Sequence, residues 1–188
     1  VEHRNLANYV AVVTNEIALN ADDTVLQQGS YVFDAFVEEF YLALLIGGKV
    51  AIPGKMLTRD IPGLCQFIAR IGANMITSTP QMLNELNKAL RDGLPGALDA
   101  RELLRSLRIV ISGGDLAKAD YFDQFLEMSQ VYNTYGPTES TVCATYYKCP
   151  ASLDLASVVP IGKPLPGCKI YVKDKYGNPS PIGVGGEL

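Results

Sequence analysis

The sequence lacks the features that mark several large classes of protein. It has no cluster of lysine or arginine, and its formal net charge is −4, so we expect no nucleic-acid-binding surface. No apolar run approaches the roughly 20 residues that a membrane-spanning helix needs, and the first residues show no signal-peptide pattern. It also has no internal repeat and no low-complexity segment. We therefore expect a cytoplasmic protein with neither a nucleic acid nor a membrane as partner.

Residues that commonly bind metals are scarce. The single histidine, His3, has no partner nearby in the sequence and is expected to be structural. Four cysteines, at positions 65, 143, 149 and 168, do not have the spacing of a metal site and are expected to be reduced thiols. The chain does have 48% hydrophobic and 19% charged residues, which is the composition of a globular protein with a sizeable core.

Hydrophobic periodicity predicts alternating strands and helices joined by short connections. This alternation indicates an α/β fold, in which helices flank a mostly parallel sheet. After residue 141 the pattern becomes β-like, which predicts an α/β core over 1–157 and the beginning of a small β subdomain over 158–188. The expected strands are 24–27, 49–53, 74–77, 107–111, 143–147 and 169–172, and the expected helices are 5–19, 30–42, 61–71, 80–90, 100–104 and 117–128.

A run of polar and aromatic residues follows a short apolar stretch at 129–131 and contains the turn Gly136-Pro137. Asn133 supplies an amide that can read a base edge, and Tyr135 supplies a ring that can stack on one. The hydroxyl of Thr138 and the carboxylate of Glu139 suit phosphate and Mg²⁺. A polar loop with a type I turn and a helix cap is the plainer alternative, but it leaves the flanking amide and aromatic residue unexplained.

Two further stretches carry candidate ligands. Asp34 and Glu38 lie four residues apart on one face of an otherwise apolar predicted helix, where carboxylates favour a cation. The plainer alternative is that Asp34 faces the helix dipole while Glu38 points to solvent. In Ile111-Ser112-Gly113-Gly114-Asp115, a strand enters a glycine turn through which backbone can approach a ligand, and Asp115 can cap the next helix.

The motif Asn133-x-Tyr-Gly-Pro-Thr-Glu139, preceded by Gly113-Gly114-Asp115, resembles the adenylate-forming superfamily, and within it the adenylation domains of nonribosomal peptide synthetases. The resemblance covers essentially the whole chain. It implies a flavodoxin-like subdomain that activates an amino acid with ATP and Mg²⁺. It also implies transfer to the phosphopantetheine thiol of a peptidyl carrier protein, with condensation domains as further partners.

The resemblance also implies the site residues. Asp34, in the pair Phe33-Asp34, would hold the substrate α-ammonium, although Phe36 stands where the family usually has a small residue. Thr138 and Glu139 would be the catalytic residues, with Glu139 as the metal ligand. The nucleotide would bind Gly114, Asp115, Asn133, Tyr135 and Thr138. The substrate would be enclosed by Ala35, Glu38, Thr77, Ile111, Gly113, Thr134, Gly136, Val142 and Cys143.

The second carboxylate, Glu38, leads to a prediction of which amino acid is the substrate. Glu38 deep in an apolar cleft would be costly without a cation, so we expect lysine, ornithine or arginine. If Glu38 turns to solvent or bonds a phenol or amide, tyrosine or glutamine would fit instead. The family's phosphate loop and catalytic lysine are expected outside 1–188, so the isolated piece should be inactive. An acyl- or aryl-CoA ligase and a non-catalytic flavodoxin-like binding module are the alternative functions.

Overall fold

The computed structural model describes residues 1–188, with the exception of the side chain of residue 97, and it places seven strands in one sheet. Their order is β2-β1-β3-β4-β5-β6-β7; β1 to β5 pair in parallel, whereas β6 and β7 are antiparallel. The predicted α/β class with a mostly parallel sheet is confirmed. The strands are β1 (Thr24–Leu26), β2 (Lys49–Ala51), β3 (Met75–Ser78), β4 (Ile109–Ser112), β5 (Gln130–Tyr135), β6 (Thr145–Lys148) and β7 (Lys163–Pro164).

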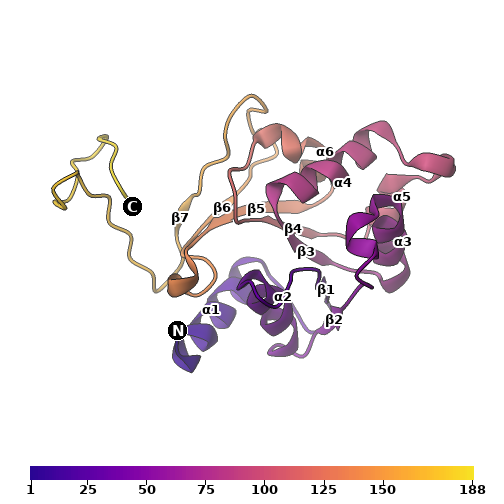
Figure 1. Cartoon of the computed structure of the whole chain (residues 1–188), viewed down its shortest axis with the longest axis horizontal. Helices are drawn as coiled ribbons and strands as arrows, with labels where there is room; N and C mark the ends of the chain where they lie inside the picture. The colour runs from indigo at the N-terminus through magenta and orange to yellow at the C-terminus, as the bar shows by residue number, and fades with distance from the viewer.

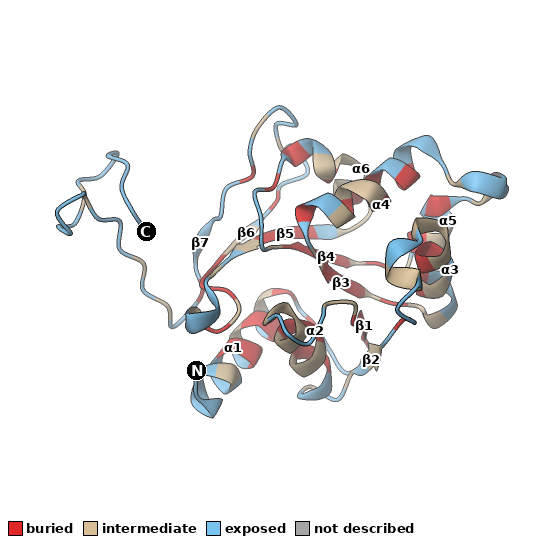
Figure 2. Cartoon of the chain, in the orientation of Figure 1, coloured by how far each residue is buried: buried red, intermediate tan, exposed pale blue. Residues whose placement is uncertain are grey.

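Helices cover both faces of the sheet (Figure 1). One face carries α1 (His3–Glu16) and α2 (Ala35–Leu44), and the other carries α3 (Ile61–Ile71), α4 (Pro80–Asp92), α5 (Ala100–Leu104) and α6 (Asp123–Leu126). The strands are largely buried between these layers (Figure 2). Alternate residues of each strand feed separate cores, as a period of two requires. Leu26, Ile76, Val110 and Val131 pack toward α3 to α6, while Val25, Met75, Ile109 and Tyr132 pack toward α1 and α2.

Local sequence sets several helix ends. The Thr79 hydroxyl accepts from the Met82 amide at 3.4 Å, and Pro80 follows it, so α4 begins with a side-chain cap and a first-turn proline. Asp99 caps α5 by accepting from the Arg101 amide at 2.9 Å. Gly72, at φ 63°, ends α3 in the left-handed conformation that glycine adopts without strain.

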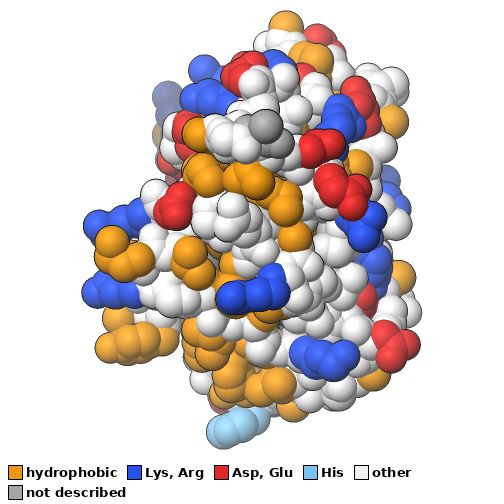
Figure 3. Space-filling view, turned by 90° about the vertical axis from the view of Figure 1, so that its right-hand side faces the viewer, with side chains coloured by type: hydrophobic (Ala, Val, Ile, Leu, Met, Phe, Trp, Pro, Cys, Tyr) orange, Lys and Arg blue, Asp and Glu red, His pale blue; other side chains and the backbone are white. Residues whose placement is uncertain are grey.

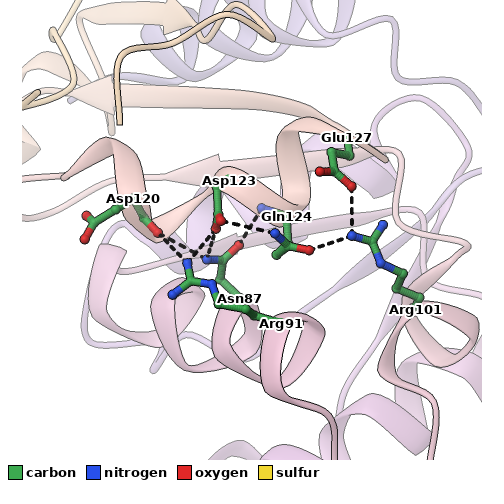
Figure 4. Close-up of polar contacts among 7 residues, drawn as sticks. All are labelled: Asn87, Arg91, Arg101, Asp120, Asp123, Gln124 and Glu127. Carbon is green, nitrogen blue, oxygen red and sulfur yellow. Dashed lines mark hydrogen bonds and ion pairs between the residues drawn. The ribbon is translucent and has the colours of Figure 1, made fainter. Parts of the chain in front are cut away.

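Side-chain contacts fasten the short helix α6 to the longer α4, and join α5 to α6 (Figure 4). The buried Asn87 amide donates to Asp123 at 2.6 Å, and Arg91 pairs with the same carboxylate at 2.8 Å. Arg101 of α5 pairs with Glu127 at 2.8 Å. The hydrogen bonds from Asn87 and Arg91 hold the pKa of Asp123 below its ordinary value. All of these contacts lie within the α3–α6 layer, so we interpret them as structural.

Three predicted elements are wrong. The helix expected over 30–42 begins only at Ala35, and the residues before it form turns. The helix expected over 117–128 is a 3₁₀ turn at 119–121 followed by the short α6, because 117 and 119 pair through backbone hydrogen bonds with 157 and 159 instead. Residues 169–172 form no strand; they belong to a tail that projects from the body of the molecule (Figure 1). The domain boundary at 157/158 stays a prediction.

Charged side chains are scattered over the face shown in Figure 3, among hydrophobic and uncharged ones, and the basic side chains on this face do not gather into one patch. None of the helices in the described chain has the length and apolar character to cross a membrane. Cys65, Cys143, Cys149 and Cys168 are free thiols, of which the first three are buried.

Candidate active site

The sheet brings the predicted site residues to one edge. Strands β1, β3, β4 and β5 run parallel, so their carboxyl ends meet, and β1 lies between β2 and β3, where the strand order reverses. Ligands of open α/β sheets bind at this edge, beside such a reversal. Asp34 follows β1, Thr77 lies at the end of β3, Gly113 follows β4, and Thr134 lies at the end of β5.

Asp34 occupies the N-cap position of α2 but does not cap the helix. Its backbone is helical, at φ −68° and ψ −17°, and its side chain makes no cap hydrogen bond. Among the described residues, its carboxylate enters no hydrogen bond and no ion pair, and it is half-buried. The alternative in which Asp34 serves the N-terminus of the helix therefore gains no support from a cap hydrogen bond. The carboxylate is free to bind a ligand, which is what the predicted contact with a substrate ammonium requires.

Glu38 lies one turn further along α2 and is 2% exposed, so the alternative in which it turns to solvent is wrong. The Tyr9 hydroxyl donates to its Oε1 at 2.6 Å. Burial raises the pKa of Glu38, and the hydrogen bond from Tyr9 and the nearby Thr77 hydroxyl offset this only in part. Burial and the neighbouring Glu38 in turn raise the pKa of Tyr9 well above its ordinary value. The carboxyl is thus held in place, and none of the cationic side chains that the structure describes pairs with it.

A cavity of about 10 Å³ beside Glu38 brings several predicted wall residues together. Ile111 of β4, Thr134 of β5 and Cys143 line it together with Glu38. The opposite side comes from α1, through Val13, Glu16 and Ile17. Burial raises the pKa of the Cys143 thiol, which favours a neutral wall residue over a nucleophile. The buried Thr77 hydroxyl lies close enough to Glu38 to lower its pKa, but among the described residues its oxygen makes no hydrogen bond.

The turn after β4 contacts the end of β5 closely. The Thr134 hydroxyl donates to the Ser112 carbonyl at 3.1 Å, and a Cβ on Gly113 would lie 2.8 Å from the same hydroxyl oxygen. A larger residue at 113 would therefore displace the Thr134 hydroxyl from the Ser112 carbonyl. Gly114 and Asp115 are exposed at this edge. Asp115 accepts from the Leu116 amide at 2.7 Å and caps no helix, contrary to the prediction, because the expected helix is broken.

Asn133 is nearly buried between β5 and the segment that follows β6. Its Nδ2 donates to the carbonyls of Pro160, at 3.0 Å, and Val159, at 3.4 Å, while its Oδ1 is buried without a partner. An acceptor in that state suits an amino group, such as the exocyclic amine of adenine. Tyr135, 42% exposed, presents its ring at the same edge. These two residues fit one face of a nucleotide base.

The turn after β5 is fixed by a close backbone approach. A Cβ on Gly136 would lie 2.5 Å from the Cys143 Cα, so only glycine fits there. Thr138 and Glu139 follow in a 3₁₀ turn over Thr138–Ser140, and both are exposed. Among the described residues, no group of three or more His, Cys, Asp or Glu side chains could hold a metal. A single carboxylate fits Mg²⁺ that is otherwise bound by substrate phosphates and water.

Strained backbone adjoins the cavity. Thr141 and Val142 have φ values of 71° and 67°, although neither is glycine and Val142 is β-branched. Such residues cost on the order of 1–3 kcal/mol each and concentrate at ligand sites. Cys143, the next residue, lines the cavity, and Val142 packs on the same core. Ala35, also predicted as a wall residue, is half-buried in the first turn of α2.

The prediction from the sequence did not include two residues at this site. Tyr9, 29 positions before Glu38, contacts it only through the fold. Glu39, 1% exposed, accepts hydrogen bonds from the loop that carries Asp34, and burial raises its pKa to about 7. The sequence could have pointed to Glu39 only as a second acid within an apolar helix. Nothing in the sequence pointed to Tyr9.

The α/β fold and the residues gathered at this sheet edge can now be compared with known proteins. The family model for the AMP-binding enzyme matches residues 1–188, so the chain belongs to that family. Bacitracin synthase 2 of Bacillus licheniformis is 39% identical over 186 residues, and tyrocidine synthase 3 of Brevibacillus parabrevis is 33% identical over 190. The matches cover 99% and 100% of this chain, but only 7% and 3% of the lengths of these two proteins.

Solved structures share the fold. The nonribosomal peptide synthetase FmoA3 in its AMPPNP-bound form has a TM-score of 0.85 at 24% identity, over 95% of this chain and 19% of FmoA3. The Vibrio cholerae adenylation domain AlmE, in complex with glycyl-adenosine-5'-phosphate, has a TM-score of 0.78 at 25% identity, over 98% of this chain and 34% of AlmE. The resemblance to nonribosomal peptide synthetase adenylation domains is confirmed.

Proposed function

We propose that the chain is the core of an adenylation domain that activates an amino acid with ATP and Mg²⁺. The observation that carries this proposal is that the unpaired Asp34 carboxylate, the partnerless Oδ1 of Asn133 and the exposed ring of Tyr135 all lie at the carboxyl edge of one sheet. Membership of the AMP-binding family and the adenylate bound by AlmE support it.

In the proposed reaction, a carboxylate oxygen of the amino acid attacks the α-phosphorus of ATP. A bond forms between this carboxylate oxygen and the α-phosphorus, the bond from the α-phosphorus to the α–β bridging oxygen breaks, and pyrophosphate leaves with the bridging oxygen. Asp34 holds the α-ammonium, Tyr135 and Asn133 hold the base, and Thr138 contacts phosphate. Bound Mg²⁺, held by Glu139, would neutralise the phosphate charge. The work of the chain is therefore positioning and charge stabilisation.

The aminoacyl adenylate would then meet a carrier-protein thiol. The thiol sulfur attacks the carbonyl carbon, AMP leaves, and the thiol proton is released. The carrier and condensation domains belong to the longer protein that we propose contains this chain. The isolated chain should form no adenylate, because the resemblance assigns the phosphate loop and a catalytic lysine to segments outside it.

We further propose that the substrate side chain is basic. Glu38 is buried with no cation of the described residues beside it, and burial raises its pKa, because a charged carboxylate is costly there. A lysine, ornithine or arginine side chain would supply the missing positive charge. Thr77, whose hydroxyl has no partner, and Thr134 could bond the distal nitrogens.

The test of adenylation is amino-acid-dependent exchange of labelled pyrophosphate into ATP by the full-length protein. Exchange that requires one amino acid supports the proposal. ATP consumption that depends on coenzyme A and a fatty or aryl acid would favour the acyl- or aryl-CoA ligase instead. Failure to bind ATP or an adenylate analogue would favour the non-catalytic module.

A further inference from the structure

Glu39 lies next to Glu38 on α2 but reaches a different part of the molecule. Its carboxylate accepts two hydrogen bonds from the Gly29 amide, at 3.1 Å to Oε1 and 2.9 Å to Oε2. Oε2 also accepts from Gln27 Nε2 at 3.1 Å. Among the described residues, no Lys, Arg or His forms an ion pair with Glu39. The hydrogen bonds of its carboxylate are therefore all with the connection that leaves β1.

This connection is built to meet the carboxylate. A Cβ on Gly29 would lie 3.0 Å from Glu39 Oε2, so glycine allows the approach. Gln27 Nε2 also donates to the Gly29 carbonyl at 2.5 Å. The neighbouring Gln28 donates to the Thr77 carbonyl at 3.1 Å, at the end of β3. Residues 27–29, which we name the β1 clamp, are thus fastened to both α2 and β3.

The β1 clamp precedes Asp34 by only a few residues. Between them, Tyr31, Val32 and Phe33 are 82%, 69% and 67% exposed, so these side chains do little to fix the segment. The Phe33 amide bonds the Ser30 carbonyl at 3.0 Å, and the chain then enters α2. Asp34 consequently lies between two fixed parts of the chain, the β1 clamp before it and α2 after it.

A buried carboxylate without a cation is rarely the most stable choice, because desolvating it costs several kcal/mol. Burial raises the pKa of Glu39 to about 7, in keeping with that cost. Its oxygens nevertheless accept hydrogen bonds from two donors, the Gly29 amide and Gln27 Nε2, which no apolar side chain could replace. A buried carboxylate of this kind is expected where the position of the segment that it bonds matters more than the stability of the fold.

We propose that Glu39 is a positioning residue for amino-acid recognition, which fixes the Asp34 carboxylate by holding the β1 clamp against α2. The inference rests on the proposed function, since Asp34 is taken to bind the substrate ammonium. Glu39 itself touches no substrate. Loss of Glu39 should therefore weaken use of the amino acid and leave use of ATP unchanged.

The experiment uses pyrophosphate exchange by the full-length protein. Glu39→Ala should raise KM for the amino acid roughly 10-fold or more, because small misplacements of a binding group are costly, and should keep KM for ATP within about twofold. Glu39→Gln should be intermediate, since an amide oxygen still accepts from Gly29. Glu102→Ala, on the exposed face of α5 and paired only with Arg105, is the matched control and should change neither constant.

Several outcomes would overturn the inference. Folded Glu39→Ala protein with an unchanged KM for the amino acid would do so, as would a parallel rise in both KM values, which indicates a general structural defect. If Glu39→Ala does not fold, Gly29→Ala decides, because its Cβ presses on Oε2 and should raise only the KM for the amino acid. Absence of exchange by the unmodified protein would overturn the proposed function and this inference together.

Discussion

Replacing Glu38 by glutamine tests the substrate proposal because the change keeps the shape and removes the charge. The glutamine oxygen can still accept the 2.6 Å hydrogen bond from Tyr9, so the cavity wall should remain in place. The carboxylate is 2% exposed, which leaves water little access to compensate a cation that has lost its partner. The effect should therefore fall on substrates with a charged side chain.

The magnitude follows from the burial. Removing one partner of a buried charge pair costs about 2–5 kcal/mol. At roughly 1.4 kcal/mol per factor of ten, kcat/KM for a basic amino acid should fall ~30- to 4,000-fold. Because Tyr9 still bonds the glutamine, we expect a value toward the lower end of that range.

The assay is pyrophosphate exchange by full-length protein with lysine, ornithine, arginine and tyrosine. Glu16→Gln is the matched control, since Glu16 lines the same cavity and accepts a 2.6 Å bond from a tyrosine, Tyr146. A larger loss in Glu16→Gln than in Glu38→Gln would refute the assignment of the charge partner. Unaffected basic substrates, or none accepted by the unmodified protein, would refute the pairing itself.

Three more predictions concern single side chains. Glu139→Gln should reduce use of Mg·ATP far more than amino-acid recognition, and an unchanged Mg²⁺ dependence of exchange would contradict the metal role. Tyr135→Ala should raise KM for ATP roughly 5- to 150-fold through lost stacking, while Tyr135→Phe should not; equal effects would count against a base on this ring. Glu39, with its pKa raised from 4.5 to about 7, stabilises the fold fully below pH 4.5 and loses this contribution as the pH rises through about 7. In urea unfolding of the chain, Glu39→Gln should remove a pH-dependent loss on the order of 3 kcal/mol, and parallel pH curves would contradict this.

The strand–helix alternation was readable from the sequence because each layer imposes its own hydrophobic period. The errors arose where distant segments decide the structure. The predicted helix over 117–128 is broken by backbone pairing with 157 and 159, which no local pattern reveals. The helix over 30–42 was extended too far because Tyr31, Val32 and Phe33 are apolar, yet they are exposed beside the β1 clamp.

The candidate site was readable to the extent that its residues follow strand ends. Ile111 and Thr134 meet at the cavity because parallel strands deliver them to one edge. Tyr9 comes from α1, whose packing against α2 the sequence does not specify, so its bond to Glu38 could not be predicted. The partnerless Asn133 oxygen likewise depends on 159–160 occupying only the amide nitrogen.

The most direct test of the central claim is a crystal structure of the full-length protein with a non-hydrolysable lysyl-adenylate analogue. The account predicts the adenine against Tyr135, with its amino group on the Asn133 oxygen. It also predicts the α-ammonium on Asp34 and the side-chain ammonium on Glu38. An analogue bound away from the carboxyl edge of β4 and β5, or with its ammonium groups distant from both acids, would contradict the account.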